Sequence, residues 1–519
     1  MQTKSTNLSE AASPELAERI QRVENGFPSL SQSGNEPPLE LTLQKLMQLY
    51  KVPGLSIAVI DNFEIAWAKG YGITEAVSSN PVTTHTLFQA GSVSKAVAAA
   101  GALHLVEQGK LSLDENINHS LKTWKVPGNE FTQEQKVTLR RILSHSAGLT
   151  VHFFPGYSIK DPIPTLTQIL DGNPPANTAS IRVDIVPGTK WRYSGGGLLV
   201  AQQAMIDVTN LPFPQLMREA IFDNMEMYDS SFEHPLPAER VKQAASGTHW
   251  NGNTVEGKWH LYPEMAAGGL WTTPSDLAKL AIELALAKRG KSNRILSHTM
   301  AREMLTPQRE DVTEFALGNA EHPDRMGLGF FLGDEARPNL FGHIGDDAGF
   351  QAMLMMDSEA GQGAAIMANS ELGILLGDCL LENIAQEYGW ENFIAPNRPR
   401  ACAGAALLVA YEEKGIQAVL TQYQMLRNAK LPRYAPDENT LLVLGYLLLA
   451  DKKPEDALEA LKLEVLEYPQ YWNAYDTLAE VYMTIGEKQL AIQNYQKSIE
   501  INPENQNAVE NIKGLIEQS

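Results

Sequence analysis

The sequence predicts an α+β domain followed by an all-helical tail. Strand-like apolar runs occur in pairs near residues 54–70 and again near 349–369, and helical patterns dominate the stretch between them. Strands at both ends with helices in the middle imply a sheet completed by distant segments, and not alternating βαβ units. The 519 residues also exceed one ordinary core, so more than one domain is expected.

The expected elements follow from local patterns. GLSIAVI (54–60) and EIAWAKG (64–70) are separated by three turn residues, which is typical of a β-hairpin. A second hairpin is expected where GFQAMLMMD and AAIMAN are joined by SEAGQG (349–369). The intervening segments 92–109 and 273–288 predict helices, the second of them begun by a Thr-Pro pair.

Composition divides the chain into four segments. Residues 1–38 are polar and predict a loose N-terminal arm with room for one short helix. The sheet-containing domain is expected over 39–390, and ENFIAPNRPR (391–400) has the character of a linker. The remaining segment, 401–519, is expected to be a helical domain.

An internal repeat of 34 residues relates the segments 438–471 and 472–505. The matched pairs are Leu444 with Leu478, Gly445 with Ala479, Ala457 with Ala491, Leu461 with Tyr495, and Pro469 with Pro503. Small residues where helices cross and Pro after the second helix resemble the tetratricopeptide pattern. Residues 403–427 predict a degenerate helix pair before the repeats. Because such stacks usually need about three units, the tail is expected to lean on the preceding domain or on a protein partner.

Bulk properties exclude several classes of protein. A formal net charge of -20 argues against nucleic-acid binding. No apolar run is long enough for a transmembrane helix. The start, MQTKSTNLSEAASPELAERIQ, lacks a signal-peptide core, so a cytoplasmic location is the default, and a periplasmic or secreted one holds if a leader was removed. Two cysteines, Cys379 and Cys402, exclude a disulfide framework and leave open one bridge or two buried thiols.

The main chemical signal is Ser-Val-Ser-Lys at 92–95, which opens an apolar, alanine-rich helix. A spacing of three residues places Ser92 and Lys95 on one helical face. A lysine in a partly dry cleft can take the proton of the serine, and the helix N-terminus favours the developing oxyanion. The plainer interpretation is an N-cap serine and a surface lysine. Against it, Ser92 is the only serine with lysine three residues on, and the strand-like TLFQAG precedes it.

Five segments, in the same order, resemble the family of class C β-lactamases, penicillin-binding proteins, D,D-peptidases and their esterase relatives. They are FQAGSVSKAVAAAGALHLVEQGKLSLDENI (88–117), LRRILSHSAGL (139–149), WRYSGGG (191–197), GGLWTTPSDLAKLA (268–281) and FGHIGDDAGF (341–350). The resemblance covers roughly residues 40 to 390. It implies a β-lactamase/transpeptidase-like fold, with an antiparallel sheet plus a helical subdomain, and a serine hydrolase that forms an acyl-enzyme on Ser92.

The resemblance also implies roles for further residues. Tyr193 stands in the family's Tyr-x-Asn motif and would shuttle a proton between Ser92 and the leaving group, whereas its plainer role is a packed turn residue. His343 replaces the lysine of Lys-Thr-Gly and would hydrogen-bond the substrate's carboxylate or carbonyl, or assist Tyr193. Gly345 would let its strand approach the substrate. The Asp346 N–H would pair with that of Ser92 as the oxyanion hole.

The chain departs from the family pattern at two motifs. Gly195 stands where β-lactamases carry an asparagine that binds the substrate's amide, and His343 removes the usual cation. Both changes point away from penicillin turnover and toward aminopeptidases and esterases. Asp346 and Asp347 would suit a substrate amine, although loop aspartates are usually only solvated. The histidines form no ligand motif, so neither a metal nor a cofactor is expected.

Two classes of function remain open from the sequence. The first is a hydrolase that cleaves a small ester or the amide of a short peptide, including peptides of D-amino acids. The second is a protein that does not turn over substrate: a catalytically weak penicillin-binding-like protein, or a binding protein whose repeats hold a protein partner. A true β-lactamase is the remaining enzymatic alternative.

Overall fold

The structure is a computed structural model that describes residues 13–27, 41–75, 80–312, 324–393, 400–429, 436–503 and 505–517. Its centre is a seven-stranded antiparallel sheet with the strand order β2-β1-β9-β8-β7-β6-β5. The seven strands are β1 (Gly54–Asp61), β2 (Glu64–Gly72), β5 (Arg325–Met326), β6 (Phe331–Leu332), β7 (Leu340–Asp347), β8 (Phe350–Asp357) and β9 (Gln362–Ala368). Both predicted hairpins are present, and β1 pairs directly with β9. The prediction of a sheet completed by distant segments is therefore confirmed.

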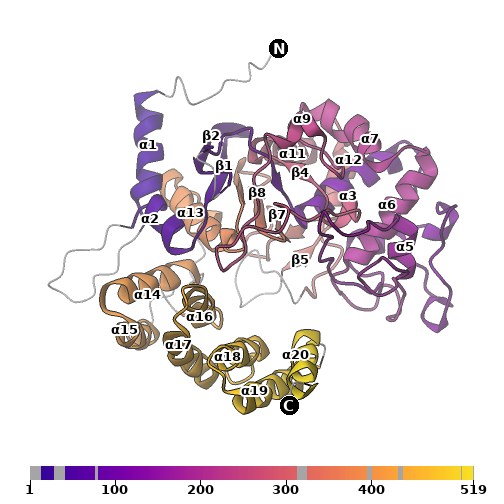
Figure 1. Cartoon of the computed structure of the whole chain (residues 1–519). Coiled ribbons are helices and arrows are strands. Elements are labelled where there is room, and N and C mark those ends of the chain that lie inside the picture. Colours follow the sequence, from indigo (N-terminus) through magenta and orange to yellow (C-terminus); the bar gives the residue numbers. More distant parts are fainter. Residues whose placement is uncertain are drawn as a thin grey trace.

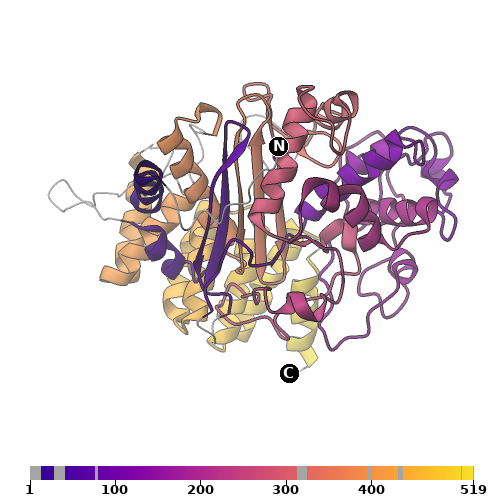
Figure 2. The same cartoon turned by 90° about the horizontal axis from the view of Figure 1, so that it is seen from above.

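The two faces of the sheet are both buried, against different helices. Ala58 and Ile60 of β1 join a core with α3 (Val93–Glu107) and α11 (Pro274–Lys288). The alternate residues Leu55, Ile57 and Val59 join a second core with α13 (Gly373–Tyr388) on the other face. This alternation is the period of two expected for a strand between two layers. Figure 2 shows the sheet between these helical layers.

A helical subdomain lies beyond α3, on the right of Figure 1. Its central helix, α6 (Gly195–Thr209), is almost entirely buried and packs on α3. The other helices of this region are α4 (Leu139–Leu143), α5 (Leu166–Asp171), α7 (Phe213–Met217), α8 (Asp223–Met225), α9 (Ala238–Val241), α10 (Met265–Gly268) and α12 (His298–Met304). A short two-stranded sheet, β3 (Phe88–Gln89) with β4 (Trp271–Thr272), leads into α3.

The N-terminal arm, for which one short helix was anticipated within residues 1–38, contains such a helix. Residues Pro14–Asn25 form helix α1, capped by Ser13, and this helix packs on α13. Val23 is buried, and its carbonyl accepts a hydrogen bond of 3.2 Å from Asn383 Nδ2. Residues 1–12 and 28–40 lie outside the described residues.

The described part of the tail consists of three consecutive helix pairs followed by one further helix. They are α14 (Arg400–Lys414), α15 (Ile416–Ala429), α16 (Thr440–Ala450), α17 (Pro454–Glu467), α18 (Trp472–Thr484), α19 (Lys488–Ile501) and α20 (Gln506–Glu517). The two segments of the 34-residue repeat correspond to α16 with α17 and α18 with α19, and residues 403–427 to α14 with α15. At the first crossing, a Cβ on Gly445 would lie 2.8 Å from Leu461 Cγ, so the small residue allows the close approach.

The tail packs on the sheet-containing domain and shares its second core. Helix α14 contacts α13 and α2 (Leu43–Leu49), as Figure 1 shows. The Trp250 and Tyr446 rings meet with centroids 4.6 Å apart. Ion pairs join Lys45 to Glu412 and Lys51 to Asp451. Of the two expected supports for the tail, the preceding domain is therefore the one observed.

The structure also bears on the possible membrane helix and on the two cysteines. No helix in the described part of the chain is both long and apolar enough to span a membrane. Cys379 is buried in α13, and the side chain of Cys402 lies outside the described residues.

Truncation after residue 398 is expected to lower the melting temperature and promote aggregation. Removing α14 uncovers apolar surface on α13 and α2, and exposed patches of this kind favour self-association. The measurement is a thermal melt with light scattering. Truncation after residue 503, which removes only α20, is the control and should change the melt less. Identical melts for the full chain and the protein ending at 398 would contradict the shared core.

Candidate active site

The turn that carries Ser92 connects strand β3 to helix α3 and is fixed by contacts on both sides of the serine. Strand β3 leads into it, and Gly91 has a φ of 49°, a left-handed conformation that favours glycine. Ser92 is the first residue before α3 and is half-buried. Two residues further on, Ser94 Oγ accepts a hydrogen bond of 3.0 Å from the Leu270 N–H. The Ser94 hydroxyl therefore has a structural role. The Ser92 hydroxyl lies at the start of the helix.

Lys95 lies directly against Ser92. Its Nζ is 2.8 Å from Ser92 Oγ and 2.7 Å from the carbonyl oxygen of Ala267. The lysine is 2% exposed, and this burial lowers its pKa to about 7, although the nearby Asp347 opposes the shift. A large share of Lys95 is then a neutral amine near pH 7, which is the form that can accept a proton.

Strand β7 passes unusually close to the same turn. A Cβ on Gly345 would lie 1.9 Å from the Ala90 carbonyl oxygen and 3.0 Å from Ser92 N, so only glycine fits. From the other side, a Cβ on Gly91 would lie 2.4 Å from Asp346 N. The two backbone N–H groups predicted as an oxyanion hole, those of Ser92 and Asp346, are thereby brought to neighbouring positions.

Tyr193 reaches the same place from the start of α6. Ser194 caps this helix, and the Tyr193 ring is 3% exposed. Lys95 Nζ lies 5.1 Å from the centre of the ring, which is stacked at 11° on Phe331. The structure therefore brings Ser92, Lys95 and Tyr193 together from two separate elements.

His343 on β7 lies near Tyr193 and is buried. The ring centroids are 6.3 Å apart, and His343 Nδ1 is 2.6 Å from the carbonyl oxygen of Ile344. A carbonyl only accepts, so Nδ1 carries the proton and Nε2 is left as an acceptor. Burial, reinforced by the charge of Lys95, lowers the pKa of His343 to about 3. His343 is thus a neutral hydrogen-bond acceptor and does not replace the missing cation.

Two further histidines contact Tyr193 and were missed from the sequence. His145 lies 4.4 Å from the tyrosine between ring centroids, and its Nδ1 accepts a 3.1 Å hydrogen bond from the Ser194 N–H. His152 lies 5.0 Å from Tyr193 by the same measure. Burial lowers the pKa of His145 well below its usual value. Each is a lone histidine in the chain, and no spacing pattern could have indicated that they converge.

Two carboxyl groups are buried near the site, Asp347 close to Lys95 and Glu264 close to Asp347. Asp347 is 8% exposed, and burial raises its pKa well above the usual value. Glu264, three residues before Ala267, is fully buried, and burial raises its pKa to about 8. Asp346, in contrast, is an exposed residue, although desolvation of its carboxyl group, reinforced by the charge of Glu371, raises its pKa to about 7. Of the two aspartates considered for binding a substrate amine, only Asp346 has its side chain open to solvent.

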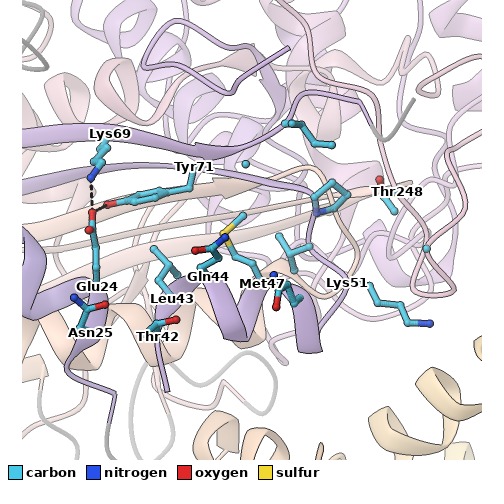
Figure 3. A pocket seen from close by; sticks show the side chains of 16 residues that line it. Glu24, Asn25, Thr42, Leu43, Gln44, Met47, Lys51, Lys69, Tyr71 and Thr248 are labelled. Atoms are coloured by element: carbon cyan, nitrogen blue, oxygen red, sulfur yellow. Dashed lines mark hydrogen bonds and ion pairs between the residues drawn. The ribbon is translucent and has the colours of Figure 1, made fainter. Parts of the chain in front are cut away.

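A separate cavity of about 820 Å³ lies between α1, α2 and β2, and none of the five family-like segments contributes a residue to its lining. Figure 3 shows Glu24, Lys69 and Tyr71 pointing toward one another at one end of it. Glu24 Oε1 lies 2.6 Å from Lys69 Nζ and 2.8 Å from the Tyr71 hydroxyl, so these groups satisfy one another. Within the described ranges, no three histidine, cysteine or acidic side chains are grouped to hold a metal ion.

Comparison with known proteins identifies the family. Residues 39–378, well over half of the chain, match the family model described as Beta-lactamase. The chain therefore belongs to the β-lactamase family, which is a family of serine hydrolases that also includes penicillin-binding proteins. The resemblance derived from the motifs is confirmed, and so is the fold class.

The similar sequences include hydrolases and penicillin-binding proteins. An unguisins hydrolase of Aspergillus violaceofuscus is 27% identical over 267 residues, which cover 46% of this chain and 43% of that protein. Penicillin-binding protein 4 of Amycolatopsis lactamdurans is 25% identical over 385 residues, covering 70% of this chain and 94% of that one. The chain thus spans less than half of the first relative and nearly all of the second.

Solved structures agree on the fold. The octameric penicillin-binding protein homologue from Pyrococcus abyssi superposes with a TM-score of 0.54 at 22% identity, covering 68% of this chain and 78% of that one. The β-lactamase/D-alanine carboxypeptidase from Yersinia pestis gives a TM-score of 0.53 at 20% identity, covering 66% of this chain and 96% of that one.

The reaction of Ser92 with a fluorophosphonate is expected to accelerate as the pH rises through about 7. Lys95 has its pKa lowered to about 7, and only the neutral amine formed above this pH can accept the serine proton. The measurement is the second-order rate constant of labelling from about pH 5 to about pH 9. Lys95→Met serves as the control and should label slowly with no inflection near 7. A labelling rate of the wild-type protein that does not change with pH would show that Lys95 is not the base.

Proposed function

We propose that this protein hydrolyses small esters, or amides of short peptides, through an acyl-enzyme on Ser92. The observation that carries the proposal is the 2.8 Å contact between Lys95 Nζ and Ser92 Oγ in a buried setting that lowers the lysine pKa to about 7. A serine hydroxyl becomes a strong nucleophile only when an adjacent base removes its proton. Lys95 supplies that base.

The neighbouring groups take the remaining roles. The Ser92 and Asp346 N–H groups stabilise the oxyanion of the tetrahedral intermediate. Tyr193, next to Lys95, passes a proton between the nucleophile and the leaving group. His343, with its free Nε2 lone pair, accepts a hydrogen bond in that proton path. This second of its two anticipated roles is favoured, because a neutral acceptor does not hold a substrate carboxylate.

The substrate assignment rests on what the site lacks. A β-lactam carries a carboxylate that needs a cationic partner, and His343 has its pKa lowered to about 3. Gly195 likewise offers no side-chain amide. Neutral esters and short peptide amides place no such demand on the site. The exposed Asp346 side chain, once ionised above its raised pKa of about 7, suits a peptide with a free amine, including one of D-amino acids.

Ser92→Ala is expected to abolish turnover, lowering kcat by about a thousand-fold or more, as the loss of a nucleophile does. The wild-type protein should be labelled by a fluorophosphonate, and the variant should not. Ser275→Ala, a serine at the start of α11, is the matched control and should keep both properties. Undiminished hydrolysis by Ser92→Ala would disprove the nucleophile. A wild-type protein that is never labelled would instead favour a binding protein without turnover.

Ester hydrolysis is expected to be much faster than hydrolysis of a chromogenic cephalosporin. The reason is the neutral His343, which leaves the carboxylate of the cephalosporin unpaired in the site. The measurement compares kcat/KM for p-nitrophenyl esters, D- and L-aminoacyl anilides and the cephalosporin. His343→Lys is expected to shift the ratio toward the cephalosporin. Efficient cephalosporin hydrolysis by the wild-type protein would contradict this preference and show that the protein acts as a β-lactamase.

A further inference from the structure

A loop from the helical subdomain is joined to the start of α6 by backbone hydrogen bonds. The Gly195 N–H donates to the His152 carbonyl at 2.9 Å, and the Gly196 N–H donates to the Val151 carbonyl at 3.0 Å. Ser194 Oγ donates to the Thr150 carbonyl at 2.9 Å. Residues 150–154 are therefore fixed against the helix start that presents Tyr193.

The Phe154 ring occupies the space into which a side chain at position 195 would project. A Cβ on Gly195 would lie 3.0 Å from Phe154 Cε2 and 3.3 Å from its Cδ2. Phe154 is half-buried and packs against the main core. Next to Gly195, at the start of α6, the chain thus places the aromatic ring of Phe154 where the family pattern has a polar asparagine side chain.

The same loop also reaches the opposite wall of the site. Tyr157 and Leu261 exchange two backbone hydrogen bonds, of 2.9 and 2.8 Å. The neighbouring His260 carbonyl accepts a 2.8 Å hydrogen bond from Gln89 Nε2, and Gln89 ends the short strand β3 that leads to Ser92. Residues 150–157 therefore connect the Tyr193 wall with the Ser92 wall.

The loop and its continuation also expose large apolar side chains, among polar ones such as Lys160 and Asp161. Phe153 is 68% exposed, and its ring lies 6.1 Å from that of His152, which in turn lies 5.0 Å from Tyr193. Ile159 and Ile163, in the continuation of the loop, are 50% and 43% exposed. Large apolar side chains left in water beside a catalytic group are typical of a surface that binds an apolar ligand.

We propose that Phe154 and Phe153 form the wall of the acyl-binding site and select substrates whose acyl group is apolar. The substrate class is an ester or amide with an aliphatic or aromatic acyl chain of several carbons, or with an amino-acid side chain of that kind. This inference rests on the proposed acyl-enzyme function. Each methylene that the wall removes from water contributes about four-fold to kcat/KM.

The test is a series of p-nitrophenyl esters from acetate to octanoate. For the wild-type protein we expect kcat/KM to rise with acyl length. Phe154→Ala should lower the octanoate-to-acetate ratio by about ten-fold or more, because only the long chain reaches the wall. Phe154→Leu should restore most of the ratio. Gly195→Ala should lower it, because the added Cβ displaces the ring.

Further variants make the result independent of folding effects. Phe153 is 68% exposed, so Phe153→Ala should melt like the wild-type protein and still lower the ratio several-fold. Phe131→Ala, a half-buried phenylalanine of the 3-10 helix Glu130–Thr132, is the control and should leave the ratio unchanged. A wild-type ratio near one, or a ratio that neither Phe154→Ala nor Phe153→Ala alters, overturns the acyl wall. If Ser92 is labelled by a fluorophosphonate in that case, the hydrolase proposal stands. If it is not labelled, both proposals fail.

Discussion

The contact between Lys95 and Ser92 depends on a dry, closely packed surrounding. Lys95 Nζ is held between Ser92 Oγ and the Ala267 carbonyl, and the burial that lowers its pKa comes from helix α3 lying between the sheet and the helical subdomain. A lysine in water would stay charged and would not serve as a base at neutral pH. The close approach of β7 at Gly345, where even a Cβ would clash, helps to keep this region closed.

The support of β7 extends to the tail. Glu371 accepts hydrogen bonds from the Trp250 N–H at 3.0 Å and from the Gly349 N–H at 3.1 Å. Gly349 lies in the turn between β7 and β8, and Trp250 packs on Tyr446 of the tail. A continuous set of contacts thus runs from the repeats to the strand edge beside Ser92. The tail therefore supports the end of β7 through Trp250 and Glu371, in addition to sharing the second core with the sheet-containing domain.

The sequence predicted those features that depend on local pattern. The strands around 54–70 and 349–369 follow from apolar runs and turn residues, and the Ser92–Lys95 pair from helical spacing. The polar composition of residues 1–38 predicted a loose arm with room for one short helix, but it did not indicate which residues form that helix or where it packs. The apolar residues Leu16, Ile20 and Val23 of α1 nevertheless recur at helical spacing and pack on the second core.

The rest could not be predicted, because it depends on segments that meet only in the folded chain. His145 and His152 precede Tyr193 by more than 40 residues in the sequence, yet both contact its ring in the folded chain, where the previously anticipated His343 also lies.

This convergence changes the electrostatics of the site. Burial and the charge of Lys95 lower the pKa of each of the three imidazoles, so they add aromatic surface and hydrogen-bonding atoms near Tyr193 without adding positive charge at neutral pH. Burial raises the pKa of Asp347, so this carboxyl group also resists ionisation. A site built of mostly neutral groups binds a charged substrate poorly, since the substrate loses its hydration without gaining a partner. The same burial therefore lowers the pKa of Lys95 and supports the proposal that the acyl group of the substrate is neutral and apolar.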